Sequence, residues 1–466
     1  MTKKLQRVLL CLPLLCGTPA FAERNVILII GDGMDDQQIT IARNYLVGAA
    51  GRLTLDNMPL RSVSQVLTVA ESGETVYVAD SANSATSMAT GEITSRGRIA
   101  TSAGSDRPLT TIAELAHAAG FRTGLVATAS ITDATPASFV AHISARYCEN
   151  PEAVYGAKIS SITLPDCPQY ARPGGGPGSI SEQIAASDID VLLGGGSKHF
   201  AIPIEGSDQT VLELARDNGY QVVESSEALA AAPVGEKLLG LFSPSHLPVR
   251  LQGENRRKAE QPRASWANQV SAYIGSVELP EPMVCEENPA FAAVPSLKEM
   301  TEAALRHLQN ERGFFLMIES ASVDKQAHER KPCGSIGEVA QLNEALDSAL
   351  AFAERHPDTL IMVTADHAQA AQMIPTDSLF AAFGIPVYSP GMIARIETPE
   401  GAVMTVNYAT NSFAYEEHTG GNVPLFANSV GLGRVATMVT QPEIFEITRD
   451  YLFEERPLET AGAENP

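Results

Sequence analysis

The stretch Asn25-Val26-Ile27-Leu28-Ile29-Ile30-Gly31-Asp32-Gly33 decides the fold. Residues 26–30 are all apolar, and Gly31 stops the run, which is typical of a short strand that is buried on both faces. Asp32 comes directly after this strand. An aspartate at that position either caps the next helix or belongs to a functional site.

Four further apolar strands follow amphipathic helices along the chain. The predicted helix–strand pairs are 109–119 with 121–127, 180–186 with 191–193, 297–308 with 314–318, and 336–354 with 359–364. Helices that alternate with wholly apolar strands predict an α/β fold with a large, mostly parallel central sheet flanked by helices on both faces. We expect one such domain over residues 23–466, with insertions at about 149–178 and 373–409, the second of which would cap the active face.

The first 22 residues read as a secretory signal peptide that is cleaved after Ala22. Lysine and arginine at 3–7 precede an apolar run at 8–15 and a small-residue cleavage pattern. The apolar run is too short for a membrane anchor. A lipoprotein signal at Cys16 is disfavoured by the bulky Leu15 before it. The sequence therefore predicts a secreted, periplasmic protein without a membrane span.

Four cysteines remain after that cleavage, which in an oxidising compartment predicts two disulfides. Three pairings are possible, and the pairs closest in sequence are Cys148 with Cys167 and Cys285 with Cys333. Cleavage also changes the formal net charge from −22 to −25, because the first 22 residues contain three basic side chains and no acidic one. Such a chain repels nucleic acid, so an anionic substrate would need local metal ions or a placed arginine.

Ser81 begins a run of small residues, 82–89, that predicts a helix. A serine at a helix start is ordinarily an N-cap, but it can also be a nucleophile whose developing charge faces the positive end of the helix dipole. The segment contains no Ser-His-Asp arrangement. Activation by a metal ion would replace a general base.

Several histidines and carboxylates have spacings that suit a metal centre. Asp324 and His328 are four residues apart and would share one helix face, Asp366 and His367 follow a buried strand, and His418 occupies a turn-like segment. Each has an ordinary explanation when taken alone. Since the chain has only nine histidines, three of them beside carboxylates favour metal binding.

Other candidates carry weaker signals. The segment Gly194-Gly195-Gly196-Ser197-Lys198 lacks the spacing of a phosphate-binding loop and is predicted to be a tight turn. His142, His199 and His246 have no comparable partners in the sequence, so we predict structural roles for them.

Six segments occur in the order found in bacterial alkaline phosphatases, and the chain resembles that family from about residue 25 to 452. They are Gly31-Asp32-Gly33-Met34, Asp80-Ser81-Ala82, Asp133-Ala134-Thr135-Pro136, the segment 319–328, Thr364-Ala365-Asp366-His367 and Glu417-His418-Thr419-Gly420. The resemblance implies an alkaline phosphatase that hydrolyses phosphate monoesters to alcohol and inorganic phosphate. It further implies a phosphoserine intermediate at Ser81, two zinc ions, one magnesium ion, an alkaline pH optimum and a homodimer.

The resemblance also implies a role for each matching residue. The first zinc would be held by Asp324, His328 and His418, the second by Asp32, Asp366 and His367, and magnesium by Asp32, Thr135 and Glu319. Arg146 would bind phosphate, and Asp133 and Lys325 would support the ligands. Gln369 stands where relatives often carry histidine, which implies altered local hydrogen bonding.

Two rival functions remain open at this point. A phosphodiesterase or sulfatase of the same superfamily is the nearer one, although a single arginine with a third metal site favours monoesters. The other is a periplasmic protein that binds phosphate or metal without catalysis, which would not need Ser81 together with a metal cluster and Arg146.

Overall fold

The computed structural model describes residues 23–156, 158–159, 162–386 and 390–454. The predicted signal peptide, residues 1–22, therefore lies outside the described residues. No helix within these ranges has the length together with the apolar composition that crossing a bilayer demands.

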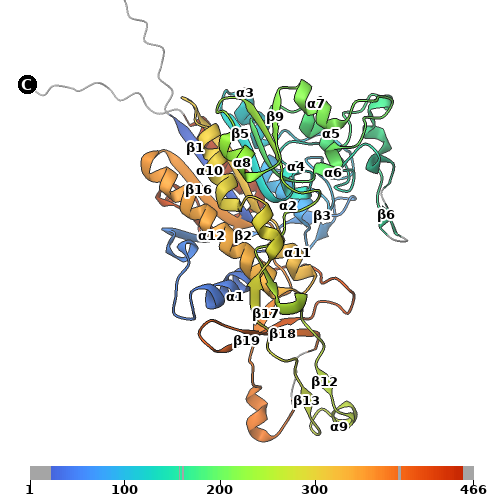
Figure 1. The fold of residues 1–466 in the computed structure, drawn as a ribbon, viewed down its shortest axis with the longest axis vertical. Coiled ribbons are helices and arrows are strands. Elements are labelled where there is room, and N and C mark those ends of the chain that lie inside the picture. The colour runs from blue at the N-terminus through green and yellow to red at the C-terminus, as the bar shows by residue number, and fades with distance from the viewer. Residues whose placement is uncertain (1–22, 157, 160–161, 387–389, 455–466) are drawn as a thin grey trace, which may run out of the picture.

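A ten-stranded sheet forms the centre of the molecule (Figure 1). Its strands, in spatial order, are β21 (Met438–Thr440), β2 (Leu60–Gln65), β20 (Val423–Ala427), β16 (Thr359–Ala365), β1 (Arg24–Gly31), β15 (Gly313–Ser320), β5 (Arg122–Ser130), β8 (Val191–Gly195), β10 (Lys237–Leu241) and β9 (Tyr220–Val223). All neighbours pair in parallel except β20, which is antiparallel to both β16 and β2. The predicted α/β fold with a mostly parallel sheet is confirmed.

The apolar side chains of strand β1 pack into two hydrophobic cores, one on each face of the sheet. Ile27 and Ile29 belong to one core, whereas Val26, Leu28 and Ile30 belong to the other. This division follows from the alternation of side chains along a strand. A strand that is buried on both faces needs apolar residues on both, which is why residues 26–30 form an unbroken apolar run.

Helices cover both faces of this sheet. The first core includes residues of α1 (Asp36–Leu46), α10 (Leu297–His307) and α12 (Pro332–Arg355). The second includes residues of α2 (Ser81–Thr90), α3 (Ile112–Ala118), α5 (Ile180–Ala185), α7 (Val211–Asp217) and α13 (Gln441–Phe453). The helix predicted at 109–119 is shorter, because Thr111 caps it in a reciprocal pair with Glu114.

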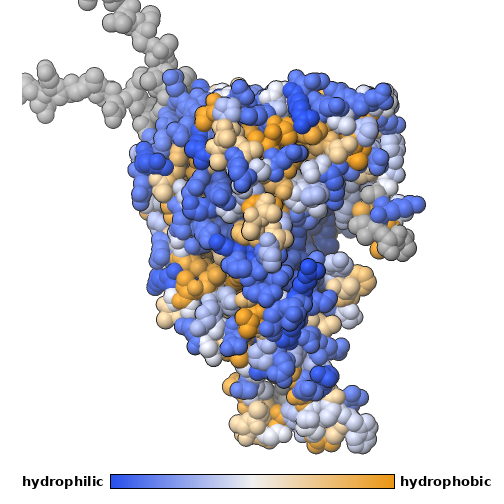
Figure 2. Space-filling view, in the orientation of Figure 1, coloured by the Kyte–Doolittle hydropathy of each residue, from blue (hydrophilic) through white to orange (hydrophobic). Residues whose placement is uncertain are grey.

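A narrow extension projects from the lower end of the molecule in Figure 1. It contains the three-stranded sheet of β17 (Gln372–Ile374), β19 (Val403–Tyr408) and β18 (Met392–Glu397), together with β12 (Arg263–Ala264), α9 (Trp266–Val270) and β13 (Val277–Glu278). Bridges Glu260↔Ile393 and Met283↔Ile396 join the two segments. Apolar residues show at its tip in Figure 2. Trp266 in α9 and Phe383 in the segment between β17 and β18 are each 79% exposed.

The sequence predicts that the segment 373–409 caps the active face. Its described residues line neither of the two cavities at the site described below. Strand β17 instead packs beside α1, and the segment continues into the extension. The second half of the extension, around α9, carried no signal in the sequence because its strands are only two residues long.

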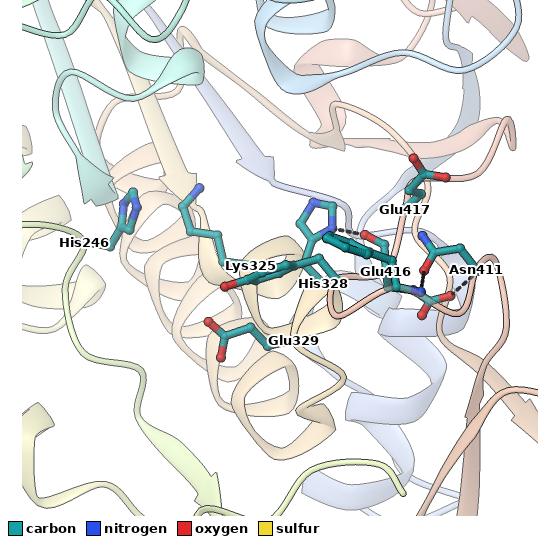
Figure 3. A pocket seen from close by; sticks show the side chains of 9 residues that line it. His246, Lys325, His328, Glu329, Asn411, Glu416 and Glu417 are labelled. Atoms are coloured by element: carbon teal, nitrogen blue, oxygen red, sulfur yellow. Dashed lines mark hydrogen bonds between the residues drawn. The ribbon is translucent and has the colours of Figure 1, made fainter. Parts of the chain in front are cut away.

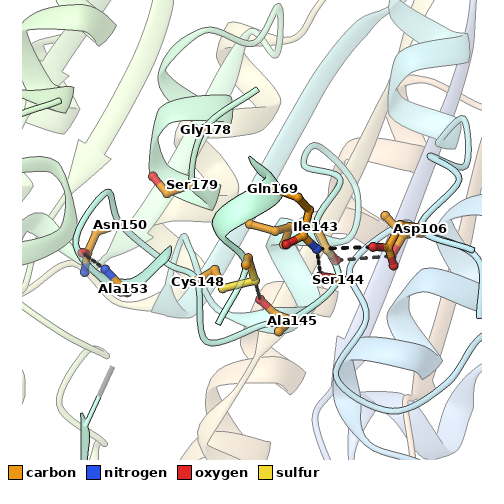
Figure 4. Close-up of a disulfide and its surroundings, with 12 residues drawn as sticks. Asp106, Ile143, Ser144, Ala145, Cys148, Asn150, Ala153, Gln169, Gly178 and Ser179 are labelled. Carbon is orange, nitrogen blue, oxygen red and sulfur yellow. Dashed lines mark hydrogen bonds between the residues drawn. A yellow bond between two sulfur atoms is a disulfide. The ribbon is translucent and has the colours of Figure 1, made fainter. Parts of the chain in front are cut away.

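Both disulfides connect the cysteines that are closest in sequence. Cys148 bonds to Cys167 and fastens the region 149–178, whose surroundings Figure 4 shows. Cys285 in β14 (Cys285–Glu287) bonds to Cys333 in the first turn of α12. The second disulfide therefore joins β14, the strand that follows the extension's β13 along the chain, to a helix that packs on the central sheet.

Candidate active site

Polar residues at the carboxyl ends of three central strands meet at one edge of the sheet. The register pairs Ile30 of β1 with Glu319 of β15 and Gly31 with Ala365 of β16. Asp32 and Asp366 directly follow the last residues of β1 and β16. Because parallel strands in register end together, these carboxylates lie side by side at the place where open α/β sheets bind ligands.

One ligand group brings together Asp324, His328 and His418. The first two lie on α11 (Ser322–His328), and His418 lies in the loop before β20. His328 Nε2 is 3.2 Å from Asp324 Oδ2 and 3.0 Å from His418 Nε2, while His418 Nε2 is 3.4 Å from Asp324 Oδ1. Two imidazole nitrogens and a carboxylate around one point are a donor set that suits zinc.

A second group surrounds His367, which is fully buried. Its Nε2 lies 3.4 Å from Asp32 Oδ1, 3.4 Å from Asp366 Oδ2 and 3.3 Å from Ser81 Oγ. Asp324 also offers a carboxylate oxygen to this group together with Asp32. The two groups are neighbours, since the rings of His367 and His418 stack with centroids 3.6 Å apart.

Ser81 is the first residue of α2 but does not cap it. The cap is Asp80, whose side chain accepts a hydrogen bond from the Asn83 N–H at 3.1 Å. The Ser81 hydroxyl is therefore free of the ordinary structural role of a serine at this position. It is buried, 3.4 Å from Asp32 Oδ1, at the positive end of the helix dipole.

Several buried oxygen atoms at the site have no hydrogen-bond partner among the residues that the structure describes. They are both carboxylate oxygens of Glu319, the hydroxyl of Thr135 and Oδ2 of Asp366. Burying such atoms without a partner costs on the order of 1–3 kcal/mol each, and more for charged groups. Oxygen atoms of carboxylates and hydroxyls are the ligands that magnesium prefers. The residues therefore fit bound divalent cations on their chemistry.

The electrostatics of the cluster point the same way. Burial, followed by the negative charges of Asp324 and Asp366, raises the pKa of Asp32 well above its usual value. Burial also raises the pKa of Glu319 to about 8, although the nearby Lys325 acts in the opposite direction. Four carboxylates are thus held close together in a dry site, where a divalent cation relieves their repulsion.

Arg146 and Lys325 contribute positive charge beside Ser81. The Arg146 guanidinium donates to Asp80 Oδ2 at 3.3 Å and to Asp133 Oδ1 at 3.1 Å. Lys325 Nζ lies 2.6 Å from Asp133 Oδ2 and 3.7 Å from Asp32 Oδ2. Ser81, Arg146 and Lys325 all line one cavity of about 630 Å³, which is large enough for a phosphate ester.

This geometry agrees with what sequence comparison finds. The sequence profile of the family described as Alkaline phosphatase matches residues 23–421, most of the chain. The chain belongs to the alkaline phosphatase family. It is 42% identical to the streptomycin-6-phosphate phosphatase of Streptomyces griseus, over 91% of this chain and 89% of that protein. It is 38% identical to the alkaline phosphatase of Escherichia coli strain K12, over 91% of this chain and 84% of that protein.

Solved alkaline phosphatases have the same fold. The enzyme from the Antarctic bacterium TAB5 aligns with a TM-score of 0.64 at 21% identity, covering 92% of this chain and 98% of that chain. The enzyme from Thermus thermophilus aligns with a TM-score of 0.63 at 22% identity, covering 95% of each. Relatives that share more than a third of their residues over most of the chain are phosphomonoesterases, and this member of the family is an enzyme of that kind. The family also implies that it uses divalent metal ions.

Two histidines for which the sequence predicted structural roles line the cavity of this alkaline phosphatase. His246 Nδ1 accepts from the Ser130 N–H at 3.1 Å and lies 3.9 Å from Asp133 Oδ2. His199 Nε2 is 3.1 Å from Glu149 Oε2. Both partners are distant in sequence, so no spacing pattern could have revealed them. Burial, then the charge of a neighbouring lysine, lowers the pKa of each histidine to about 4.

Two other sequence-based interpretations agree with the structure. His142 is structural, because its ring nitrogens bond the Ala100 carbonyl at 3.0 Å and Glu114 Oε1 at 2.9 Å. The glycine-rich segment forms a tight turn, with Gly196 at a φ of 95° before a short helix.

Gln369, singled out in the sequence analysis, contacts the candidate metal-binding cluster directly. Its side-chain Nε2 donates to Asp324 Oδ1 at 2.5 Å, and its Oε1 accepts from the Ala370 N–H at 2.8 Å. The side chain is buried, so this donor has a fixed orientation. Gln369 thus restrains the carboxylate of Asp324.

Proposed function

We propose that this enzyme hydrolyses phosphate monoesters to alcohol and inorganic phosphate through a phosphoserine at Ser81. One observation carries the proposal above the others. The Ser81 hydroxyl, which does not cap α2, lies within 3.4 Å of both Asp32 and His367. These two residues belong to the carboxylate–imidazole cluster, and Ser81 and Arg146 line the same cavity.

We propose two zinc ions and one magnesium ion as the cofactors. The zinc ligands would be Asp324, His328 and His418 for one ion, and Asp32, Asp366 and His367 for the other. Magnesium would take Asp32, Thr135 and Glu319, in keeping with the unpartnered oxygens of the last two. When bound, such cations lower the pKa of a nearby hydroxyl and neutralise charge on a phosphoryl group.

In the proposed reaction, Ser81 Oγ attacks phosphorus in line with the bond to the alcohol. That P–O bond breaks, and the alcohol leaves with a proton. Water then cleaves the phosphoserine, releasing inorganic phosphate and returning a proton to Ser81. The N-terminus of α2 favours negative charge at Ser81, and the two donor nitrogens of Arg146 can bind two phosphoryl oxygens at once. Asp133 holds both Arg146 and Lys325 in place.

We further propose a secreted, periplasmic location, a signal peptide over residues 1–22, a single catalytic domain and a homodimer. The two disulfides support an oxidising compartment. The homodimer and the single-domain description rest on the resemblance to the family.

The proposed reaction is tested by comparing three nitrophenyl esters on the purified enzyme, together with its metal content. We expect the monoester to react faster than the diester or the sulfate by on the order of 10³-fold, because only the phosphate monoester offers the charged site three non-bridging oxygens that carry two negative charges. The diester has two such oxygens, and the sulfate has three that carry a single negative charge. Faster turnover of the diester or sulfate would identify the rival enzyme class. No turnover of any ester, with phosphate or metal still bound, would indicate a binding protein.

Arg146→Ala is expected to weaken inhibition by inorganic phosphate by roughly 10- to 100-fold, because two charge-assisted hydrogen bonds are lost. The inhibition constant is measured beside the zinc and magnesium content, which should stay unchanged. Arg107→Ala is the matched control, since Arg107 is exposed and pairs with Glu92 on the surface. An inhibition constant equal to that of the unmodified enzyme would remove Arg146 from the phosphate site.

A further inference from the structure

A second cavity adjoins the one that contains Ser81. It has a volume of about 660 Å³ and shares His246, Lys325 and His328 with the first cavity. Its remaining walls are Glu329, Asn411, Phe413, Tyr415, Glu416 and Glu417. Figure 3 shows His328 between Lys325 on one side and the Glu416 loop on the other. A group in this cavity would therefore lie beside the ligand cluster, where the alcohol part of a substrate needs room.

The outer wall of this cavity is the loop 411–417, which hydrogen bonds from Arg330 hold rigidly. Arg330 is buried and donates to Glu416 Oε2 at 2.6 Å, to the Phe413 carbonyl at 2.8 Å and to the Ala414 carbonyl at 3.3 Å. Glu416 Oε1 also accepts from the Thr410 hydroxyl at 2.6 Å. The loop backbone is thus fixed before any ligand arrives, which lowers the entropic cost of binding there.

Two aromatic rings stand on this fixed backbone and face solvent. Phe413 is 68% exposed and Tyr415 is 56% exposed. Single exposed aromatics are common, but two in one short loop at the mouth of a cavity form a recognition surface. The faces of such rings attract cations through their quadrupole.

The fixed charges around the rings are negative. Lys325 is neutralised by Asp133 at 2.6 Å, and Arg330 by Glu416. Glu329 pairs with Lys331 at the surface. Glu417 bonds Thr410 through its backbone N–H at 3.1 Å, and within the described part of the chain its carboxylate has no lysine, arginine or histidine in salt-bridge contact. The cavity therefore retains an excess of negative charge beside its aromatic rings.

We infer that this second cavity binds the alcohol part of the phosphomonoester and favours alcohols that carry an ammonium or guanidinium group. The inference rests on the proposed function and adds a substrate class to it. A cationic alcohol gains both from the rings of Phe413 and Tyr415 and from the carboxylate of Glu417. A neutral alcohol gains only the rings, and an anionic one is repelled.

The inference is tested with two esters of nearly equal shape. Phosphocholine carries a quaternary ammonium where 3,3-dimethylbutyl phosphate carries a quaternary carbon. We expect kcat/KM to be higher for phosphocholine by about 10-fold at low ionic strength, because the esters differ only in the charge that the cavity would recognise. A ratio of one or less would overturn the inference.

Variants separate local recognition from the general attraction of a negatively charged protein. Glu417→Gln and Phe413→Leu should each lower the ratio of the two kcat/KM values by about 3-fold or more. Glu224→Gln is the matched control, because it removes the same charge from an exposed position next to β9, at the far edge of the sheet. The inference fails if Glu224→Gln lowers the ratio as much as Glu417→Gln does, or if neither cavity variant changes it.

The two proposals fail in different ways. If the unmodified enzyme hydrolyses both esters with equal efficiency, the phosphatase function stands and only the preference for cationic alcohols is wrong. If it hydrolyses neither ester nor a nitrophenyl monoester, the proposed function itself is wrong, and the inference falls with it.

Discussion

Ser81→Ala is expected to lower phosphomonoester turnover by on the order of 10³-fold or more, because the variant has no oxygen at the position that would attack phosphorus. The direct measurement is a rapid acid quench with labelled substrate. The unmodified enzyme should show one labelled phosphoserine per active site under conditions in which hydrolysis of the intermediate is slow. The alanine variant should show none, with its metal content preserved.

Ser84→Ala provides a matched control for this experiment. Ser84 lies on the same helix and is buried, and its hydroxyl has no hydrogen-bond partner among the described residues. Its removal leaves no polar group stranded, so turnover and label should stay close to those of the unmodified enzyme. A full burst of labelled protein from Ser81→Ala would place the nucleophile elsewhere.

Removal of the metal ions is expected to abolish activity and to reduce stability together. Asp32, Asp366, Glu319 and Asp324 are buried within one site, and without cations their charges repel one another. A ligand present at 100 times its dissociation constant stabilises a protein by about 2.7 kcal/mol, and several ions act at this site. We therefore expect the chelated protein to lose at least about 3 kcal/mol of its free energy of unfolding.

The measurement compares turnover and thermal unfolding before chelation, after removal of the chelator, and after metal is returned. Zinc with magnesium should restore both properties, whereas magnesium alone should leave turnover low because imidazole ligands favour zinc. Full activity in a protein that contains no zinc would contradict the assignment of the two histidine-containing groups.

The central sheet and most of the site could be predicted because their signals are local. Strands such as β1 have an unbroken apolar run, residues 26–30 in that case, and candidate ligands such as Asp32 and Asp366 directly follow such strands. By contrast, the neighbourhood of His246 depends on Asp133, more than a hundred positions earlier in the chain. Such a contact exists only after folding and leaves no periodic pattern.

Local rules also competed at single positions. In the sequence analysis, only Ser81 is weighed as the N-cap of its helix, although Asp80 before it is also a good N-cap residue. The structure assigns the cap to Asp80, which leaves the serine hydroxyl available. The extension was missed for a related reason, since its shortest strands have too few residues to show alternation.

The buried pair of Arg330 and Glu416 has a consequence for how substrate preference can diverge among related enzymes. The Glu416 carbonyl also contacts His328 Nδ1, so the base of the loop helps to hold a proposed metal ligand. Phe413 and Tyr415, at the crest of the loop, have side chains that are exposed to solvent. Selection can therefore exchange the crest residues freely for new alcohols, while any change at the base disturbs catalysis for every substrate at once.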